Sequence, residues 1–248
     1  MDDVDKTAGA QSLRRALHVL RLIGEHPADG MKLSAVIRAS GLTRSTAHRL
    51  LSCLVEEHFV ERDNATQNYR LGVDAMQIGF ASMRQAPLIS RLQPVMQKLA
   101  RLTGDTLFLL VRQGDFSLCL HREEGHFPVK VFTTDVGERR LLGLGAGGLA
   151  LMAELPDAEI AEIVGRNATT YAKSGFSLPL MMAAVGRTRL SGYAEIMDTV
   201  TKGVSGVGRT FSPSPSTLAA LSIGAIGARL LAERRRELAQ MLKEELRR

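Results

Sequence analysis

Hydrophobic residues recur at helical spacing in the first part of the chain. The first such run consists of Leu13, Ala16, Leu17, Leu20 and Ile23. Ser12 stands before this run and predicts an N-cap, whereas Pro27 and Gly30 predict that the helix has ended. Leu33, Val36 and Ile37 predict a second, short helix over Lys32–Ser40.

A tight turn and a third helix follow. Gly41 supplies the turn's unusual backbone conformation, and Thr43 is the expected N-cap of a helix that runs to about Glu57. One face of this helix is apolar, with Ala47, Leu50, Leu51 and Leu54. The opposite face is polar and carries Ser45, His48, Arg49, Ser52 and Glu56, with Arg44 beside its start. A short helix, a glycine turn and a second helix led by hydrogen-bond donors predict a helix-turn-helix.

Two short strands are expected behind this helix and would form a wing. Phe59–Arg62 and Asn68–Leu71 flank the turn residues Asp63–Thr66. In a major groove, Arg bonds guanine edges, and Ser, Thr and His reach bases or phosphates. The alternative interpretation is that the polar face is only the solvated surface of a three-helix domain. The candidate DNA-binding residues are Thr43, Arg44, Ser45, Thr46, His48, Arg49 and Arg62.

The pattern changes around residue 72. Val73–Arg84 is compatible with a helix, Pro87 breaks it, and Leu88–Leu102 resumes helical spacing. One continuous fold is the alternative to a domain boundary here. The expected organisation is an N-terminal domain, a linker helix and a C-terminal domain, over residues 1–72, 73–86 and 87–248.

Beyond residue 104 strands and helices are mixed. The expected strands are an antiparallel hairpin of Thr106–Arg112 and Phe116–Arg122, a further strand over Lys130–Phe132, and a central pair formed by Val204–Phe211 and Leu218–Ile223. The expected helices are Leu144–Glu154, Ala158–Val164, Leu180–Gly192 and Ala228–Leu246. Since strands group around helices without regular βαβ alternation, the fold class is α+β.

Composition narrows the class of protein without identifying a partner. The 248 residues are 45% hydrophobic and 23% charged, which is ordinary for a globular protein. The net charge of +6 is not concentrated in the predicted helix-turn-helix, because residues 1–85 hold 11 Lys/Arg against 10 Asp/Glu. The acidic start lacks an apolar stretch, and Cys53 and Cys119 are the only cysteines. We therefore expect a cytoplasmic protein without a membrane partner.

Four segments resemble IclR-type bacterial transcriptional regulators. They are Ser12–Leu17, Gly41–Leu51, Phe59–Asp63 and Tyr69–Gly72. The resemblance covers nearly the whole chain and implies a winged helix-turn-helix joined by a helix to a GAF/PAS-like effector-binding domain. It further implies a homodimer or homotetramer that binds a pseudo-palindromic double-stranded DNA operator under the control of a small organic acid. Repression is the expected mode, with activation as the alternative.

A glycine-rich turn in the second half admits two interpretations. Gly143, Gly145 and Gly148 match the G-x-G-x-x-G pattern of dinucleotide-binding enzymes. The polar residues 133–140 before it do not predict a buried strand, and no second strand ending in an acid follows. A glycine turn that opens a helix suits a carboxylate, because free N–H groups and the helix dipole attract anions. Close helix–sheet packing through small residues is the structural alternative.

The resemblance places an effector pocket at this turn. It implicates a candidate set of Val131, Arg139, Leu142, Gly145, Ala146, Ile196, Val204, Gly206 and Ser222. Ile196 and Gly206 stand where the family's small-acid binders would carry a polar and a larger side chain, and Gly224 replaces a hydroxyl. These departures predict a roomier, more apolar pocket for an aromatic or longer acyl acid. Arg139 and Arg140, just before the turn, are candidates to balance a carboxylate, and solvated charges are the alternative.

No catalytic constellation is evident in the sequence. Cys119, His121 and His126 lie close together, but they lack a fourth ligand and the spacing of a zinc site. We therefore expect a regulator with no cofactor and no enzymatic activity. Two alternatives are a small-molecule enzyme that binds a nucleotide at Gly143–Gly148 and a helix-turn-helix used only for protein contacts.

Overall fold

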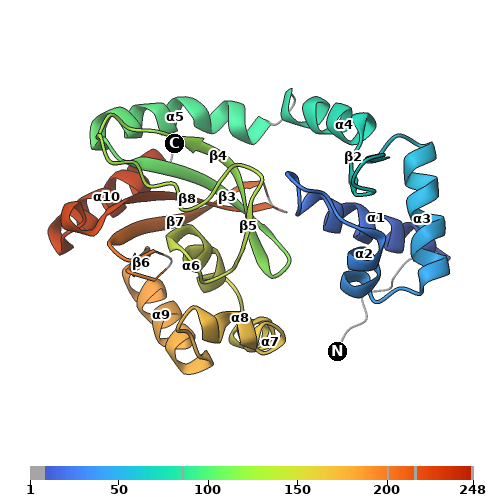
Figure 1. The fold of residues 1–248 in the computed structure, drawn as a ribbon. Coiled ribbons are helices and arrows are strands. Elements are labelled where there is room, and N and C mark those ends of the chain that lie inside the picture. The colour runs from blue at the N-terminus through green and yellow to red at the C-terminus, as the bar shows by residue number, and fades with distance from the viewer. Residues whose placement is uncertain (1–8, 85–86, 200, 215–216, 247–248) are drawn as a thin grey trace. The chain divides into compact units, whose positions relative to one another are not determined.

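The chain folds into two separately packed units, residues 1–86 and 87–248 (Figure 1). The computed structural model describes residues 9–84, 87–199, 201–214 and 217–246. The acidic start and positions 85–86 of the predicted linker lie outside the described residues. Among those that are described, no helix is long and apolar enough to cross a membrane.

The first unit is three helices, a hairpin and a fourth helix. Its elements are α1 (Gln11–Gly24), α2 (Leu33–Ser40), α3 (Arg44–Glu56), β1 (Val60–Arg62), β2 (Tyr69–Leu71) and α4 (Val73–Arg84). The apolar faces of α1, α2 and α3 meet in a core that includes Val19, Val36 and Leu51. The hairpin closes this core with Val60 and Tyr69. The predicted order of helices and strands is confirmed.

The local signals at the helix ends are confirmed with one exception. Gly41 has the left-handed φ of 66° that ends α2. The Thr43 side chain accepts a hydrogen bond of 3.3 Å from the N–H of Thr46 and caps α3. The predicted Ser12 cap is wrong, because α1 already begins at Gln11 and its N-cap, Ala10, offers no side-chain acceptor.

The second unit is built on a six-stranded antiparallel sheet with the order β5-β4-β3-β8-β7-β6. The strands are β3 (Thr106–Gln113), β4 (Phe116–Glu123), β5 (Arg139–Leu141), β6 (Ala194–Met197), β7 (Val204–Ser214) and β8 (Thr217–Ile226). The predicted hairpin of β3 and β4 and the predicted pair of β7 and β8 are both present.

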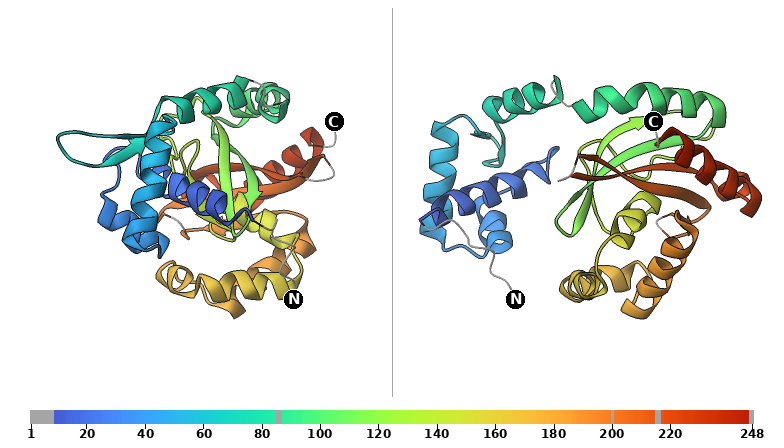
Figure 2. Two further views of the ribbon diagram at one scale, coloured as in Figure 1. Left: turned by 90° about the vertical axis from the view of Figure 1, so that its right-hand side faces the viewer. Right: turned by 180° about the vertical axis from the view of Figure 1, so that it is seen from behind.

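Helices cover both faces of this sheet (Figures 1 and 2). They are α5 (Pro87–Thr103), α6 (Ala146–Ala153), α7 (Asp157–Arg166), α8 (Ala168–Lys173), α9 (Leu178–Ser191) and α10 (Ala232–Glu245), with a 3₁₀ turn at Gly227–Arg229. Helices α6 to α9 pack on one face and α5 and α10 on the other, so the sheet separates two hydrophobic cores. This is the predicted α+β class.

Three expectations in this unit are corrected. Lys130–Phe132 is not a strand, since it lies in an irregular segment after β4. Phe132 there is exposed under the Arg122 guanidinium, 4.4 Å from its ring centre, rather than paired in the sheet. The helix expected from Leu144 begins at Ala146, because Gly145 has a φ of 89°. The closing helix begins at Ala232 after the 3₁₀ turn, not at Ala228.

Candidate nucleic-acid interface and ligand pocket

Helix α3 presents a polar surface because its apolar face is fixed in the core. Ala47 and Leu51 are fully buried against the other helices of the first unit. Since a helix turns 100° per residue, His48 and Arg49 between them face away from the core, whereas Leu50 packs against it. Thr43, Arg44, Ser45, His48 and Arg49 are exposed, and Thr46 is half-buried. The predicted candidates therefore lie together at the leading end of α3.

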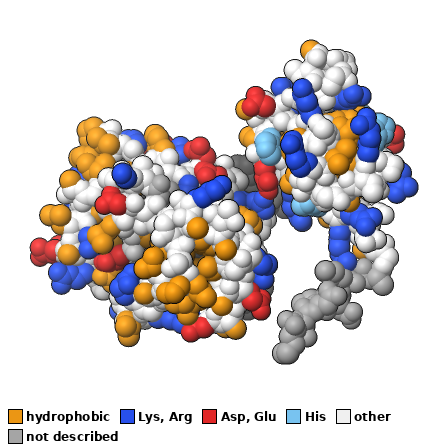
Figure 3. Space-filling view, turned by 60° about the horizontal axis from the view of Figure 1, so that its bottom comes forward, with side chains coloured by type: hydrophobic (Ala, Val, Ile, Leu, Met, Phe, Trp, Pro, Cys, Tyr) orange, Lys and Arg blue, Asp and Glu red, His pale blue; other side chains and the backbone are white. Residues whose placement is uncertain are grey.

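The hydroxyl groups at the start of α3 are held in a fixed arrangement. The Thr43 hydroxyl lies 2.9 Å from that of Thr46 and 3.3 Å from that of Ser45. The N-terminal end of a helix carries a partial positive charge and attracts phosphate groups. Lys, Arg and His side chains spread over the surface of this unit (Figure 3). Such a surface can meet a phosphate backbone and present donors to base edges.

Arg62 lies on the hairpin rather than on α3. Its side chain is exposed, with the guanidinium carbon 5.6 Å from the centre of the Tyr69 ring on the paired strand. The hairpin turn beyond it is held by Asp63, whose carboxylate accepts the N–H groups of Thr66 at 2.7 Å and Ala65 at 3.0 Å. The hydrogen bonds that Asp63 accepts from the N–H and from the hydroxyl of Thr66 lower the pKa of Asp63. The hairpin is thus a defined wing that carries a cation.

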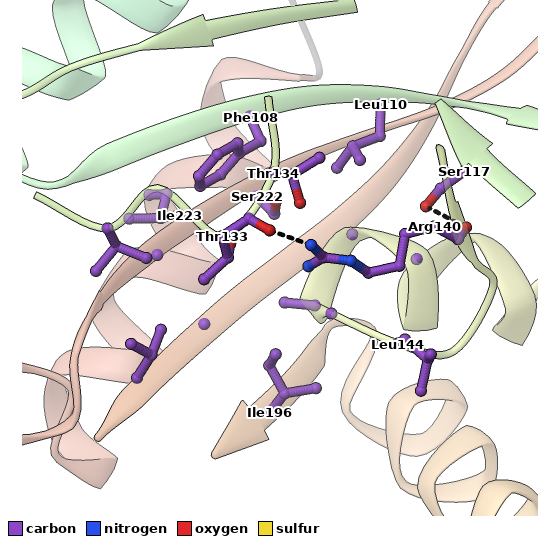
Figure 4. A pocket seen from close by; sticks show the side chains of 18 of the residues that line it. Phe108, Leu110, Ser117, Thr133, Thr134, Arg140, Leu144, Ile196, Ser222 and Ile223 are labelled. Atoms are coloured by element: carbon purple, nitrogen blue, oxygen red, sulfur yellow. Dashed lines mark hydrogen bonds between the residues drawn. The ribbon is translucent and has the colours of Figure 1, made fainter. Parts of the chain in front are cut away.

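The second unit contains a pocket of about 530 Å³, open solvent at its mouth included, between the start of α6 and the sheet (Figure 4). Strands β3, β7 and β8 supply apolar residues, and the segment after β4 closes one side. The main apolar side chains are Phe108, Leu110, Val131, Leu144, Ile196 and Val204, and the polar ones are Ser117, Thr133, Thr134, Arg140 and Ser222. Ile223 also borders the pocket, but its side chain packs in the core on the opposite face of the sheet. The pocket is therefore mostly apolar with a polar part.

The start of α6 opens onto this pocket. Gly145 is the N-cap, and no described residue accepts a hydrogen bond from the N–H groups of Ala146, Gly147 and Gly148. The helix also lies close to the sheet, because a Cβ atom on Gly208 would lie only 2.6 Å from the carbonyl of Ala146. Small residues therefore serve packing and leave the first-turn N–H groups accessible at the same time.

Seven of the nine sequence-predicted pocket residues line the cavity. They are Val131, Gly145, Ala146, Ile196, Val204, Gly206 and Ser222. Leu142 does not, because its side chain is fully buried in the core. Its carbonyl accepts a 2.7 Å hydrogen bond from the buried hydroxyl of Tyr171, whose pKa burial raises. Leu142 thus holds the glycine turn in place from behind.

Arg139 is also outside the pocket, and its neighbour Arg140 takes the predicted place. Adjacent strand residues point to opposite faces, and Arg140 pairs across the sheet with Ser117, another lining residue. The Arg139 guanidinium carbon instead lies 5.0 Å from the centre of the Phe116 ring. A strand over 139–141 would have indicated that only one of the two arginines faces the pocket. This short, charged segment did not predict a strand.

The glycine turn does not belong to a dinucleotide-binding unit. Strand β5 before it is a three-residue edge strand in an antiparallel sheet, and α6 is followed by α7 rather than by a parallel strand. The crossover that places a nucleotide between parallel strands is therefore not formed here. Cys119 lies in the core, where burial raises the pKa of its thiol to about 11.

Together these features define a two-domain protein with a winged helix-turn-helix and an α+β domain that encloses a pocket. The model of the IclR helix-turn-helix domain matches residues 12–64, and that of the bacterial transcriptional regulator IclR C-terminal domain matches residues 80–247. The chain belongs to the IclR family of bacterial transcriptional regulators. It is a DNA-binding regulator and not an enzyme.

Curated relatives agree with this assignment. The chain is 27% identical to the transcriptional regulator TtgV of Pseudomonas putida, over 82% of this chain and 77% of that protein. It is also 27% identical to the regulator XynR of Escherichia coli, over 89% and 88%. The crystal structure of an IclR family regulator from Brucella abortus superposes with a TM-score of 0.82 at 18% identity, covering 100% of this chain and 92% of the other.

Proposed function

We propose that this regulator reads a pseudo-palindromic operator by inserting α3 from each of two copies into successive major grooves. The single observation that supports this most is the exposure of Arg44, His48 and Arg49 on one helix whose opposite face is fixed in the core. Arg62 on the wing would contact a flanking phosphate. The remaining candidates, Thr43, Ser45 and Thr46, would position the helix against the backbone.

We infer that a small organic acid is the effector and that it occupies the pocket at α6. The first-turn N–H groups of α6 would hold the carboxylate, with the Ser222 hydroxyl beside them. The apolar lining, in particular Phe108, Leu110 and Ile196, suits an aromatic ring or a longer acyl chain. Binding there would change the affinity for DNA through a coupling between the two units.

A homodimer or homotetramer is proposed for the working form. Helix α4 carries four large apolar side chains, Val73, Met76, Ile78 and Phe80, each more than half exposed. Val73, Met76 and Phe80 share one face of the helix, whereas Ile78 lies on the opposite face. Exposed apolar faces of this kind mark interaction sites in soluble proteins. A second copy covering α4 would also bring two α3 helices onto one operator, as a pseudo-palindrome requires.

Repression is the proposed mode of regulation. Relatives from Salmonella typhi and Klebsiella pneumoniae that are 25% and 24% identical bear the name transcriptional repressor AllR. Expression of a reporter behind the operator, with and without this protein, separates repression from activation. Higher reporter activity in the presence of the protein would assign it as an activator.

The experiment that tests the DNA-reading proposal is selection of binding sites from a random DNA pool by the full chain. We expect two half-sites related by a two-fold axis and separated by about one helical turn. Binding should weaken steeply with salt, as phosphate contacts require. A selected pool with no enriched sequence would contradict operator reading and would favour a helix-turn-helix used for protein contacts.

A further inference from the structure

The donors around the pocket outnumber what one carboxylate can accept. Thr134 and Ser222, residues that are more than nine-tenths buried, line the cavity beside the α6 N–H groups (Figure 4). Their hydroxyls have no hydrogen-bond partner among the described residues. Arg140 adds a formal positive charge. These hydroxyl and guanidinium donors suit a ligand with acceptor atoms beyond those of one carboxylate.

The Arg140 guanidinium is only partly satisfied by the protein. Its Nη2 donates to the carbonyl of Thr133 and, at 3.3 Å, to a carboxylate oxygen of Glu138. No described residue accepts from Nε or Nη1. Glu138 is a weak neutralising partner, because its side chain is 44% exposed and its other oxygen accepts the N–H of Asp135 at 2.8 Å.

We propose that the effector carries two acidic groups, one held at the start of α6 and a second held by Arg140. This inference rests on the proposed function, since it concerns the same pocket. A guanidinium presents donors in a planar fork that matches a carboxylate, and a partly buried cation gains more from an anion than from a neutral oxygen. The class of ligand is thus a dicarboxylic acid, with its hydrocarbon body against the apolar lining.

The test compares acids of equal carbon number on the full-length protein by calorimetry. The probe pairs are succinate against butyrate, adipate against hexanoate and terephthalate against 4-methylbenzoate. In at least one pair we expect the dicarboxylate to bind at least tenfold more tightly than the monocarboxylate. The substitution Arg140→Met should remove that preference, and Arg140→Lys should retain part of it because the charge remains. Melting temperatures of the ligand-free variants establish that they are folded.

Arg139→Met is the matched control, since Arg139 is the adjacent strand residue outside the pocket. It should leave both affinities within about twofold of the wild type. The proposal of two acidic groups would be overturned if the monocarboxylate bound equally or more tightly in every pair, or if the preference survived Arg140→Met. The proposal of an acid effector would then still stand. Failure of every acid to bind the wild type would overturn the acid effector itself, and this inference with it.

Discussion

Gly72 packs directly against the backbone of His58, and a Cβ atom at Gly72 would overlap the His58 carbonyl oxygen. The same carbonyl accepts the N–H of Asp74 at 3.2 Å in the first turn of α4, and Gly72 donates to the carbonyl of Phe59 at 2.8 Å. His58 itself has a φ of 56° in the turn after α3. The wing, the end of α3 and the start of α4 are therefore joined through backbone contacts.

Gly72→Ala should consequently destabilise the first unit and weaken DNA binding. The added methyl meets backbone rather than a flexible side chain, so we expect a loss of roughly 1–3 kcal/mol in the free energy of unfolding. Gly79→Ala in α4 is the control, because its Cβ would meet nothing within 4 Å. Chemical denaturation of both variants measures the difference. Equal stabilities of the two variants would show that the backbone around Gly72 and His58 can shift to accommodate a methyl group without a large loss of free energy.

Arg49→Ala should weaken operator binding without unfolding the protein, because the side chain is exposed and α3 is anchored elsewhere. A lost base contact costs roughly 1–3 kcal/mol and relaxes one operator position, whereas a lost phosphate contact weakens all sequences alike. Titration against the selected operator and single-base variants distinguishes these cases. Unchanged affinity in a folded Arg44→Ala, Arg49→Ala double variant is incompatible with the proposed docking.

Gly145→Leu should abolish binding of the acid while leaving DNA binding intact. Gly145 has a φ of 89° that side chains rarely adopt, and its Cβ would enter open space at the mouth of the pocket. Gly175→Leu shares the backbone strain, with a φ of 77° and open space, but does not line the pocket. Calorimetry with the best acid compares the two. Equal binding to both variants would place the effector elsewhere.

Acid should remove the contribution that Asp115 makes to stability. A hydrogen bond from Arg166, the largest cause, lowers the pKa of Asp115 below its ordinary 3.8. Its stabilisation is thus fully present above pH 3.8 and is lost as the pH falls through the lower native value. Arg166→Met should lower the melting temperature only slightly at pH 7, because solvent screens an exposed ion pair. The difference in melting temperature between Arg166→Met and the wild type should shrink below pH 3.8. Thermal melting at several pH values measures it. A difference that stays constant with pH would exclude the ion pair as its source.

Much of this fold was predictable from local patterns in the sequence. The turn at Gly41 and the cap at Thr43 depend on neighbouring residues alone, and both were identified correctly. Periodicity likewise predicted the pairing of β7 with β8. Strand β6 (Ala194–Met197) and helix α8 (Ala168–Lys173) were missed, since each is short and depends on packing against distant residues.

The pocket was harder to predict because it is assembled from segments far apart in the chain. Resemblance to the family identified the glycine turn and residues of β6, β7 and β8 as candidates. The choice between Arg139 and Arg140 required the register of β5 on β4, which three charged and apolar residues do not determine by themselves. Thr133 and Thr134 line the pocket from the irregular segment after β4, just beyond Lys130–Phe132, where a strand was expected.

The most direct test of the account is a titration of the protein–operator complex with the acid that binds most tightly to the pocket. Fluorescence anisotropy of labelled operator DNA, at fixed salt, measures the affinity for DNA at each acid concentration. The account predicts a saturable change in DNA affinity, at least fivefold, that is absent in Gly145→Leu and retained in Gly175→Leu. An operator affinity that stays constant while calorimetry shows the pocket filled would contradict a ligand-responsive regulator.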